Sequence, residues 1–203
     1  MSKKYRSATG VEELYYAVLS EEGSELTKGD IQMVDYLQTI EIEMPQEPVR
    51  AFGSNRTAEI AIANGNISVS SAFHRIPQED KATLFGLEMR NGLYAYGPDD
   101  IPPYVAVIFA KTFEDGSKEW VGLVKGIFMR PNIAGKTKED GVEFSTDEVT
   151  AEFMERRVDS FGNEYKTLLM GTDERGKTDV RDQLFMDIFG KEFPGITNGG
   201  LKR

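Results

Sequence analysis

Short runs of strand-forming residues, separated by turn residues, recur along this chain and constrain its fold more than any other feature. Ile40 to Met44 alternates apolar and acidic residues, which predicts a strand with one buried face and both carboxylates on the other. Thr57 to Ala63 and Ile67 to Phe73 repeat the alternation on either side of Asn64-Gly65-Asn66. This pattern predicts a hairpin over 57–73 with its tight turn at that tripeptide.

Further strands are predicted on both sides of this region. Tyr104 to Phe113 and Lys118 to Phe128 flank the turn sequence Glu114-Asp115-Gly116-Ser117, which predicts a second hairpin. In the predicted strand Phe144 to Val158 neither face is purely apolar, so the sequence leaves its burial open. The other predicted strands are Val11 to Ser20, Ile31 to Met44 and Tyr165 to Met170.

Two short helices complete the expected elements. Pro77 can occupy the first turn of a helix over Gln78 to Phe85, which Gly86 would end. Thr178 is expected to cap a helix over Asp179 to Phe189, which has one apolar stripe and stops at Gly190. About eight strands and two helices predict a mainly β, α+β fold: an antiparallel β-sandwich or partly closed barrel flanked by one or two helices.

The length of 203 residues predicts one domain over 1–203, because two domains would each have a marginal core. Hydrophobic residues make up 39% of the chain and aromatic residues 10%, enough to form such a core. We expect loose segments at residues 1–9 and 191–203, the latter because the chain from Gly195 onward is rich in glycine and polar residues.

Charge and composition exclude several classes of function. Thirty-four acidic against 24 basic residues leave a net charge of −10, which argues against gripping nucleic acid through a basic face. The absence of cysteine excludes disulfides, thiol catalysis and Cys-ligated metals. The longest apolar run, Tyr104 to Ala110, is far shorter than the roughly 20 residues that span a bilayer. Met1 to Arg6 is basic without the apolar stretch of a signal peptide, so we expect no membrane association or export.

The patterns that could support catalysis are all weak. Ala134-Gly135-Lys136-Thr137 resembles the end of a phosphate-binding loop, but Arg130 stands where that motif needs its first glycine. His74 is the only histidine, and Trp120 lies in a strand that looks buried. Carboxylates are plentiful, and most acidic residues belong to solvated faces. We therefore predict no catalytic, cofactor-binding or metal-binding residue, and a protein that is not an enzyme.

The segment 45–56 stands out between the predicted strands. It contains two prolines and shows no periodicity in its apolar residues, which predicts irregular structure. Irregular segments of this length in a compact domain are usually functional or mobile. We therefore expect a contact arm here.

Several segments, taken together and in order, resemble the major tail protein, or tail tube protein, of long non-contractile phage tails. Those segments are Gly10 to Leu19, Pro103 to Ile108, Lys125 to Phe128, Lys136 to Glu139, Val142 to Phe144, Glu152 to Met154, Arg157, and Phe185, Ile188 and Phe189. The resemblance covers about residues 8–190.

This resemblance implies a structural virion subunit that assembles as hexameric rings, stacked into a tube that conducts the DNA genome. In the family a long hairpin reaches the adjacent ring, a role that would fall on Ile42 to Ile60. The implied partners are further copies of the chain, the tape measure, tail terminator and distal tail proteins, and DNA that passes without specific binding. The implied location is the virion, with host cytoplasm during assembly, and no cofactor is implied. The expected ring-stacking residues are Pro45, Pro48, Val49, Arg50, Phe52, Asn55 and Arg56.

An acidic lumen would repel the phosphates of the DNA and leave the duplex free to slide. Glu41, Glu43 and Glu59 lie on the polar faces of alternating strands and are our lumen candidates. Two alternatives stay open for individual residues: these acids face outside and keep the tail soluble, or Phe52 packs under its own loop. Two others stay open for the whole chain: a tube subunit of a contractile tail or secretion system, or a monomeric β-barrel carrier or small hydrolase. A carrier would need a closed apolar pocket, whereas a tube subunit needs a long arm.

Overall fold

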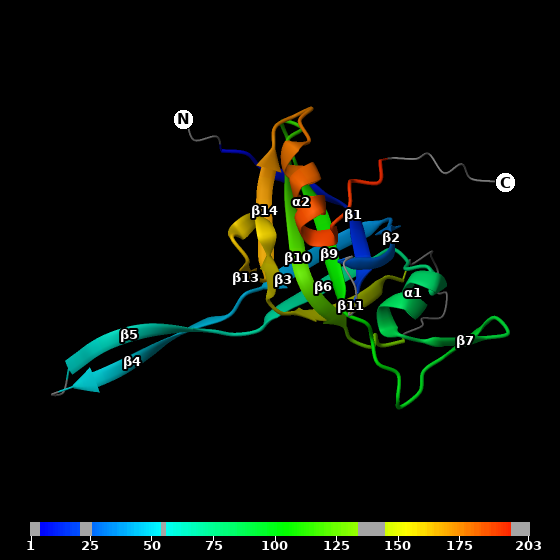
Figure 1. Cartoon of the computed structure of the whole chain (residues 1–203), viewed down its shortest axis with the longest axis horizontal. Coiled ribbons are helices and arrows are strands. Elements are labelled where there is room, and N and C mark those ends of the chain that lie inside the picture. Colours follow the sequence, from blue (N-terminus) through cyan, green and yellow to red (C-terminus); the bar gives the residue numbers. More distant parts are fainter. Residues whose placement is uncertain (1–4, 21–25, 54–55, 134–144, 196–203) are drawn as a thin grey trace, which may run out of the picture.

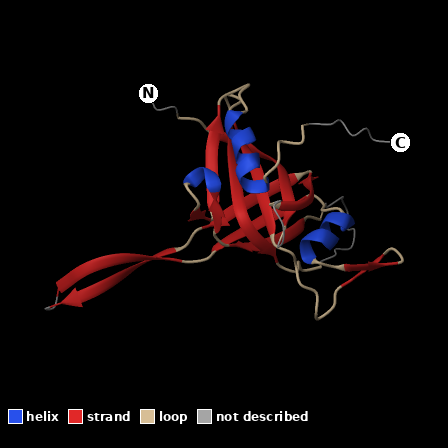
Figure 2. Cartoon of the chain, in the orientation of Figure 1, coloured by secondary structure: helices blue, strands red, loops and turns tan. Residues whose placement is uncertain are grey.

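The computed structural model describes residues 5–20, 26–53, 56–133 and 145–195. These residues are mainly β, with two α-helices and one large antiparallel sheet (Figures 1 and 2). The elements in chain order are β1 (Ala8–Leu19), β2 (Thr27–Val34), β3 (Leu37–Glu43), β4 (Gln46–Gly53), β5 (Arg56–Asn64), β6 (Ile67–Phe73), α1 (Gln78–Phe85), β7 (Glu88–Arg90), β8 (Leu93–Ala95), β9 (Val105–Phe113), β10 (Lys118–Phe128), β11 (Asp147–Phe153), β12 (Arg156–Val158), the 3₁₀ turn η1 (Asp159–Phe161), β13 (Glu164–Lys166), β14 (Leu168–Asp173) and α2 (Asp179–Phe189).

The main sheet has eight strands, in the order β2-β1-β9-β10-β11-β6-β3, with β14 also paired to β10. Strand β10 makes this branch possible, because residues 118–123 pair with β14 and residues 126–128 pair with β11. Gly126 lies at the branch, where an added Cβ would come within 2.5 Å of the Glu152 carbonyl oxygen. The sheet curls until β3, its last strand, contacts β1, so it forms a partly closed barrel.

The central strands β1, β9 and β10 bury side chains on both faces, and each face supports its own core. The inner core, within the curled sheet, includes Tyr16, Val107 and Leu123, and α1 adds Leu84 and Phe85. The outer core lies beneath α2, which covers the opposite face of the sheet in Figure 1. Burial on both faces explains why β9 reads as a continuous apolar run rather than an alternation.

Aromatic side chains close the outer core. Trp120 is only 5% exposed, which confirms it as a core residue. Its ring meets Phe185 of α2 edge to face, with 6.2 Å between the ring centres. Phe193, after the end of α2, joins the same cluster at 5.0 Å from the Phe185 ring centre. Phe193 therefore packs against the outer core, while 196–203 lie outside the described residues.

The hairpin predicted over 57–73 is wrong. Strand β5 pairs with β4, whereas β6 pairs with β3 and β11. Asn64 and Gly65 do not have the positive φ angles that a two-residue hairpin turn requires. Instead, the Gly65 N–H donates to the Pro45 carbonyl at 2.9 Å, across the ribbon. Residues 37–73 therefore form one long ribbon in two paired parts, β3–β6 and β4–β5.

Asn91-Gly92 does form a tight hairpin turn, with positive φ angles of 51° and 78°. It joins β7 to β8 inside a stretch that the sequence analysis left without strands. The prediction that 45–56 is irregular is also wrong, because most of it is strand β4. Three predicted strands are each divided: 31–44 at Tyr36, where φ is 61°, 144–158 between β11 and β12, and 165–170 between β13 and β14.

Other predictions are confirmed. Strands β9 and β10 form the expected hairpin around Gly116, and α1 ends at Gly86 in the left-handed conformation. The first strand begins three residues earlier than expected, at Ala8. The structure also decides which face of β11 is buried: Val149, Ala151 and Phe153 point into the core.

Two polar contacts attach α1 to the sheet. The Tyr16 hydroxyl donates to Asp80 Oδ1 at 2.6 Å, and Lys81 Nζ lies 2.9 Å from Asp147 Oδ2. Burial alone would raise the pKa of Asp147, but the Ile76 N–H bond and the Lys81 ammonium outweigh it, so its pKa is lowered. The carboxylate therefore stays ionised and ties α1 to β11.

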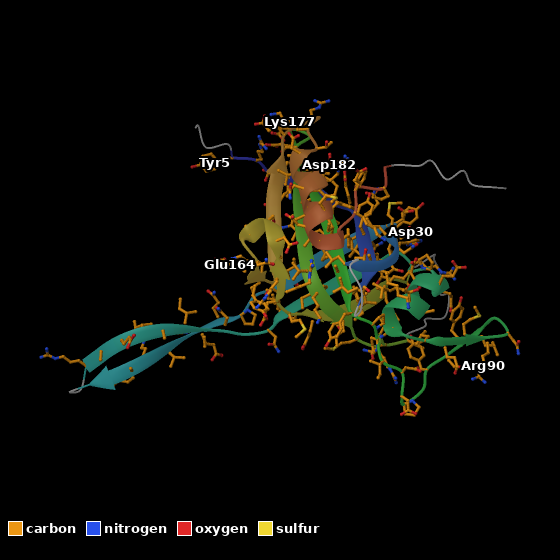
Figure 3. The ribbon with its side chains drawn as sticks, in the orientation of Figure 1. Tyr5, Asp30, Arg90, Glu164, Lys177 and Asp182 are labelled. Atoms are coloured by element: carbon orange, nitrogen blue, oxygen red, sulfur yellow. The ribbon has the colours of Figure 1, made fainter. Side chains whose placement is uncertain are left out.

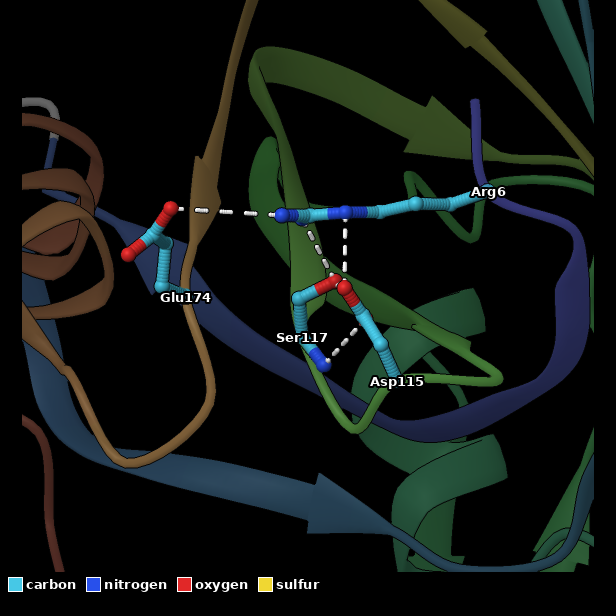
Figure 4. A network of polar contacts seen from close by, with 4 residues as sticks. All are labelled: Arg6, Asp115, Ser117 and Glu174. Carbon is cyan, nitrogen blue, oxygen red and sulfur yellow. Dashed lines mark hydrogen bonds and ion pairs between the residues drawn. The ribbon is translucent and has the colours of Figure 1, made fainter. Parts of the chain in front are cut away.

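The segment before β1 is held by Arg6 (Figure 4). Its guanidinium donates to the Ser117 hydroxyl at 2.8 Å and lies 2.7 Å from Asp115 Oδ2, both in the β9–β10 turn. A third contact, 4.0 Å long, reaches Glu174 beyond β14. Arg6 thus joins the chain start to two turns, while residues 1–4 lie outside the described residues.

The N-terminus of α2 is capped by Asp173, not by Thr178 as predicted. The carboxylate of Asp173 accepts the Val180 and Arg181 N–H groups at 2.9 and 3.0 Å. Thr178 makes no side-chain capping bond, and its hydroxyl donates to Asp182 instead. The end of β14 therefore satisfies two N–H groups that an N-cap side chain usually satisfies.

We expect Asp173→Ala to lower the free energy of unfolding by about 1–3 kcal/mol, because it removes two charge-assisted bonds at a buried position. Thr178→Ala is the matched control and should change it by less than about 0.5 kcal/mol. Urea denaturation followed by circular dichroism measures both. An equal loss in the two variants would contradict the assignment of the cap.

Candidate functional site

The ribbon formed by β4 and β5 projects from the body of the molecule as a two-stranded arm (Figures 1 and 2). It continues the pair β3–β6 beyond the edge of the main sheet. Its described side chains are all exposed. Within the described residues, therefore, neither face of the arm is covered by the rest of the chain.

One face of the arm is largely apolar. Directly opposed residues share a face of an antiparallel pair, and here Pro48 lies opposite Ile62 and Arg50 opposite Ile60. Phe52 continues this face two residues farther along β4. The exposed fractions are 73% for Phe52, 58% for Ile60 and 64% for Ile62. Phe52 is therefore not packed under its own loop.

The other face carries the acidic residues of the arm. Glu59 lies opposite Ala51, Glu47 opposite Ala63, and Val49 opposite Ala61. The two carboxylates are thus separated from Arg50 by the ribbon. The apolar face has a cation and no carboxylate among Pro48, Arg50, Phe52, Ile60 and Ile62.

The base of the arm is tightly built. An added Cβ at Gly65 would lie 2.8 Å from Pro45 Cγ, so a larger residue there would force the two strands apart. Just beyond, the Gln46 side-chain amide donates to Asn64 Oδ1 at 3.0 Å. These contacts keep β4 and β5 paired at the point where the ribbon leaves the body.

Of the seven residues predicted for ring stacking, four lie in β4: Pro48, Val49, Arg50 and Phe52. Pro45 lies at the base, Arg56 begins β5, and Asn55 is outside the described residues. The arm implied by the resemblance ended at Ile60 and so missed Ile62, because the alternation assigned β5 to a hairpin with β6. The pairing of β4 with β5 places both residues in the arm.

A second candidate surface is the outward face of β3, β6 and β11. Glu41 lies opposite Ser70, which lies opposite Thr150; Glu43 lies opposite Ser68, which lies opposite Glu152. Ser68 also donates to Glu43 Oε2 at 3.4 Å. The three strands contain no lysine or arginine. The result is an acidic face made of Glu41, Glu43, Glu148 and Glu152 with interspersed hydroxyl groups.

Two of the three lumen candidates, Glu41 and Glu43, lie together on the acidic face. Glu59 does not join them, because β5 belongs to the arm. Glu148 and Glu152 were missed, although their alternation with Val149 and Ala151 was visible in the sequence. Alternation alone could not say that β11 lies beside β6, so it could not add these residues to the same face.

Other features of the described surface lie outside the arm and the acidic face. Within the described residues, no group of three or more His, Cys, Asp or Glu side chains could hold a metal ion. An open depression of about 580 Å³ has a mixed lining, with apolar residues such as Leu19 beside charged residues such as Lys125 and Arg157. No helix in the described part of the chain is long and apolar enough to cross a membrane. The phosphate-loop-like residues 134–137 lie outside the described residues.

Comparisons with known proteins identify no family for this chain. No family model and no curated protein matches its sequence. Among solved structures, one similar chain comes from the cryo-EM structure of the anti-feeding prophage (AFP) baseplate, 6-fold symmetrised. The overlap covers 84% of this chain and 97% of that chain, with 9% sequence identity and a TM-score of 0.38. At this level the overlap defines no corresponding residues.

Because the arm is exposed on both faces, Phe52→Ser and Ile60→Ser should each change the free energy of unfolding by less than about 0.5 kcal/mol. Phe185→Ala, at a fully buried site, should cost about 3–5 kcal/mol. Urea denaturation of the three variants tests this. A loss of several kcal/mol from either arm substitution would show that the arm belongs to the core.

Proposed function

We propose that this protein is a structural subunit that polymerises as stacked hexameric rings into the tube of a long, non-contractile phage tail. The observation that carries the proposal is the projecting β4–β5 arm with its uncovered apolar face. The sequence also resembles tail tube proteins, in which a long hairpin reaches the adjacent ring. This resemblance indicates the kind of assembly in which such an arm is used.

Binding to a partner would stabilise the exposed arm. An isolated two-stranded hairpin is at best marginally stable in water. This one also exposes Phe52, Ile60 and Ile62 on a single face. Covering an apolar side chain of this size contributes roughly 1.5–3 kcal/mol. Binding another copy would therefore stabilise both the arm and the assembly.

The position of the arm favours an open polymer. A contact between different surfaces of identical subunits, repeated without closing, produces a filament. The arm lies at one end of the longest axis of the molecule (Figure 1). Each subunit would therefore extend its arm to the next ring while receiving an arm from the previous one.

The acidic face fits the inner wall of a channel for DNA. A wall that neutralised phosphates would hold the duplex through counterion release. Glu41, Glu43, Glu148 and Glu152 would instead repel it, and their strands contain no cation to offset that effect. In this proposal DNA passes without binding, and Glu59 contributes to the arm rather than to the wall.

The remaining partners follow from the same assembly. The subunit would be part of the virion after assembly in host cytoplasm, and the tube would contact the tape measure, tail terminator and distal tail proteins. A ring of six is the number that the resemblance implies. No catalytic step or cofactor is part of this role.

The proposal predicts that the purified protein forms hollow tubes when it is concentrated, as seen by negative-stain electron microscopy. Replacing residues 45–66 by Asn-Gly should abolish the tubes and leave a folded monomer. This design removes both strands of the arm and closes Met44 and Ile67 with a two-residue hairpin turn. The control is Met170→Ser, which changes an exposed apolar residue on β14 outside the arm.

Normal tubes from the armless variant would contradict the role of the arm. Failure of the unaltered protein to assemble, even when short preformed tubes are added as seeds, would contradict the proposed function itself. Circular dichroism of the armless variant checks that the body remains folded.

Charge reversal on the acidic face should slow genome ejection several-fold without preventing assembly. The variant is Glu41→Lys, Glu43→Lys and Glu152→Lys, supplied to virions in place of the native subunit. A control with the same change in charge reverses Glu114, Glu164 and Asp182, which are exposed outside the acidic face. Equal ejection rates in the two sets of virions would show that the acidic face does not line the channel.

A further inference from the structure

A second exposed apolar surface lies on and after the β7–β8 hairpin. Met89 is 59% exposed, Leu93 74%, Tyr96 41% and Ile101 84%. We call these four residues the distal patch. Met89 and Leu93 lie on opposite faces of the hairpin, because Met89 pairs with Tyr94 and Leu93 pairs with Arg90. Single exposed apolar residues are common, whereas several gathered on one projecting segment are typical of an interaction surface.

The loop that follows the β7–β8 hairpin is held against the body at two points. Gly86, at the end of α1, packs so closely on this segment that an added Cβ would lie 2.5 Å from the Ile101 carbonyl oxygen. Arg130 donates to the Gly97 carbonyl, and its guanidinium lies 5.7 Å from the centre of the Tyr96 ring. Ile101 is therefore exposed on a fixed backbone rather than on a freely moving one.

The distal patch and the arm lie at opposite ends of the molecule. In Figure 1 the arm extends to one end of the longest axis and β7 to the other. Arg90, on β7, marks this second end in Figure 3. Two surfaces so placed cannot meet within one chain, but they can meet between successive copies.

We propose that the distal patch receives the apolar face of the arm from a second copy of this chain. This inference rests on the proposed function and names the partner surface of the arm. Phe52, Ile60 and Ile62 would pack against Leu93 and Ile101, so both apolar surfaces would leave water together.

The charges of the two surfaces allow one ion pair between copies, since Arg90, which lies opposite Leu93, is already paired with Glu88. Arg50 lies on the apolar face of the arm, and Asp99 lies within the segment of the distal patch. Within the described residues, neither has an ion-pair partner. Their pairing between copies would set the register of the contact, which apolar packing alone defines poorly.

Cysteine crosslinking tests this contact without background, because the chain contains no cysteine. Four double variants combine Phe52→Cys or Ile60→Cys with Leu93→Cys or Ile101→Cys. Under oxidising conditions, assembled protein should give a ladder of covalent multimers that reduction abolishes, because a disulfide requires two Cα atoms within about 7 Å. The matched control pairs Ile60→Cys with Met170→Cys, whose native side chain is 67% exposed on β14.

Tubes that form normally but give no ladder above the control with any of the four pairs would overturn this inference and leave the proposed function standing. A ladder without tubes would support the contact and contradict the tube. Neither tubes nor ladder would overturn both.

Discussion

The burial of both faces of β9 and β10 is the constraint on which the rest of this structure depends. One face packs against the inner surface of the curled sheet and α1, and the other packs against α2. Because both faces of these central strands are buried, the sheet exposes a polar face on the outlying strands β3, β6 and β11. The same arrangement leaves β3 and β6 free to continue beyond the body as the arm. Both candidate surfaces therefore follow from how the centre is packed.

The arm and the distal patch share a physical property. Each includes a two-stranded ribbon that exposes large apolar side chains to water. In each, a close backbone contact at a glycine, Gly65 or Gly86, fixes where the ribbon or loop begins. A chain that only needed a stable core would gain nothing from these features, whereas a subunit that binds further copies gains apolar area at defined positions.

Two of the Asn-Gly pairs in the chain show where local sequence rules stop. Asn64-Gly65 and Asn91-Gly92 present the same dipeptide, but only the second adopts the positive φ angles of a hairpin turn. Around the first, the alternating segments on both sides pair with more distant strands, so the dipeptide becomes a junction within a longer ribbon. In the same way, Asp173 displaced Thr178 as the cap of α2, because β14 brings a carboxylate to the helix start. Distant partners outweighed local preference in both cases.

The sequence by itself determined the mainly β class, the β9–β10 hairpin, both helices with their glycine ends, and the acidic alternation of Glu41 and Glu43. These features depend on periodicity and turn chemistry over a few residues, which any chain carries in its local pattern. Only the tertiary structure decided that β4 and β5 form the arm, that Ile60 and Ile62 are exposed, and that Glu148 and Glu152 join the acidic face. Those outcomes depend on which strands pair across tens of residues, and an alternating strand fits any partner that offers a matching edge.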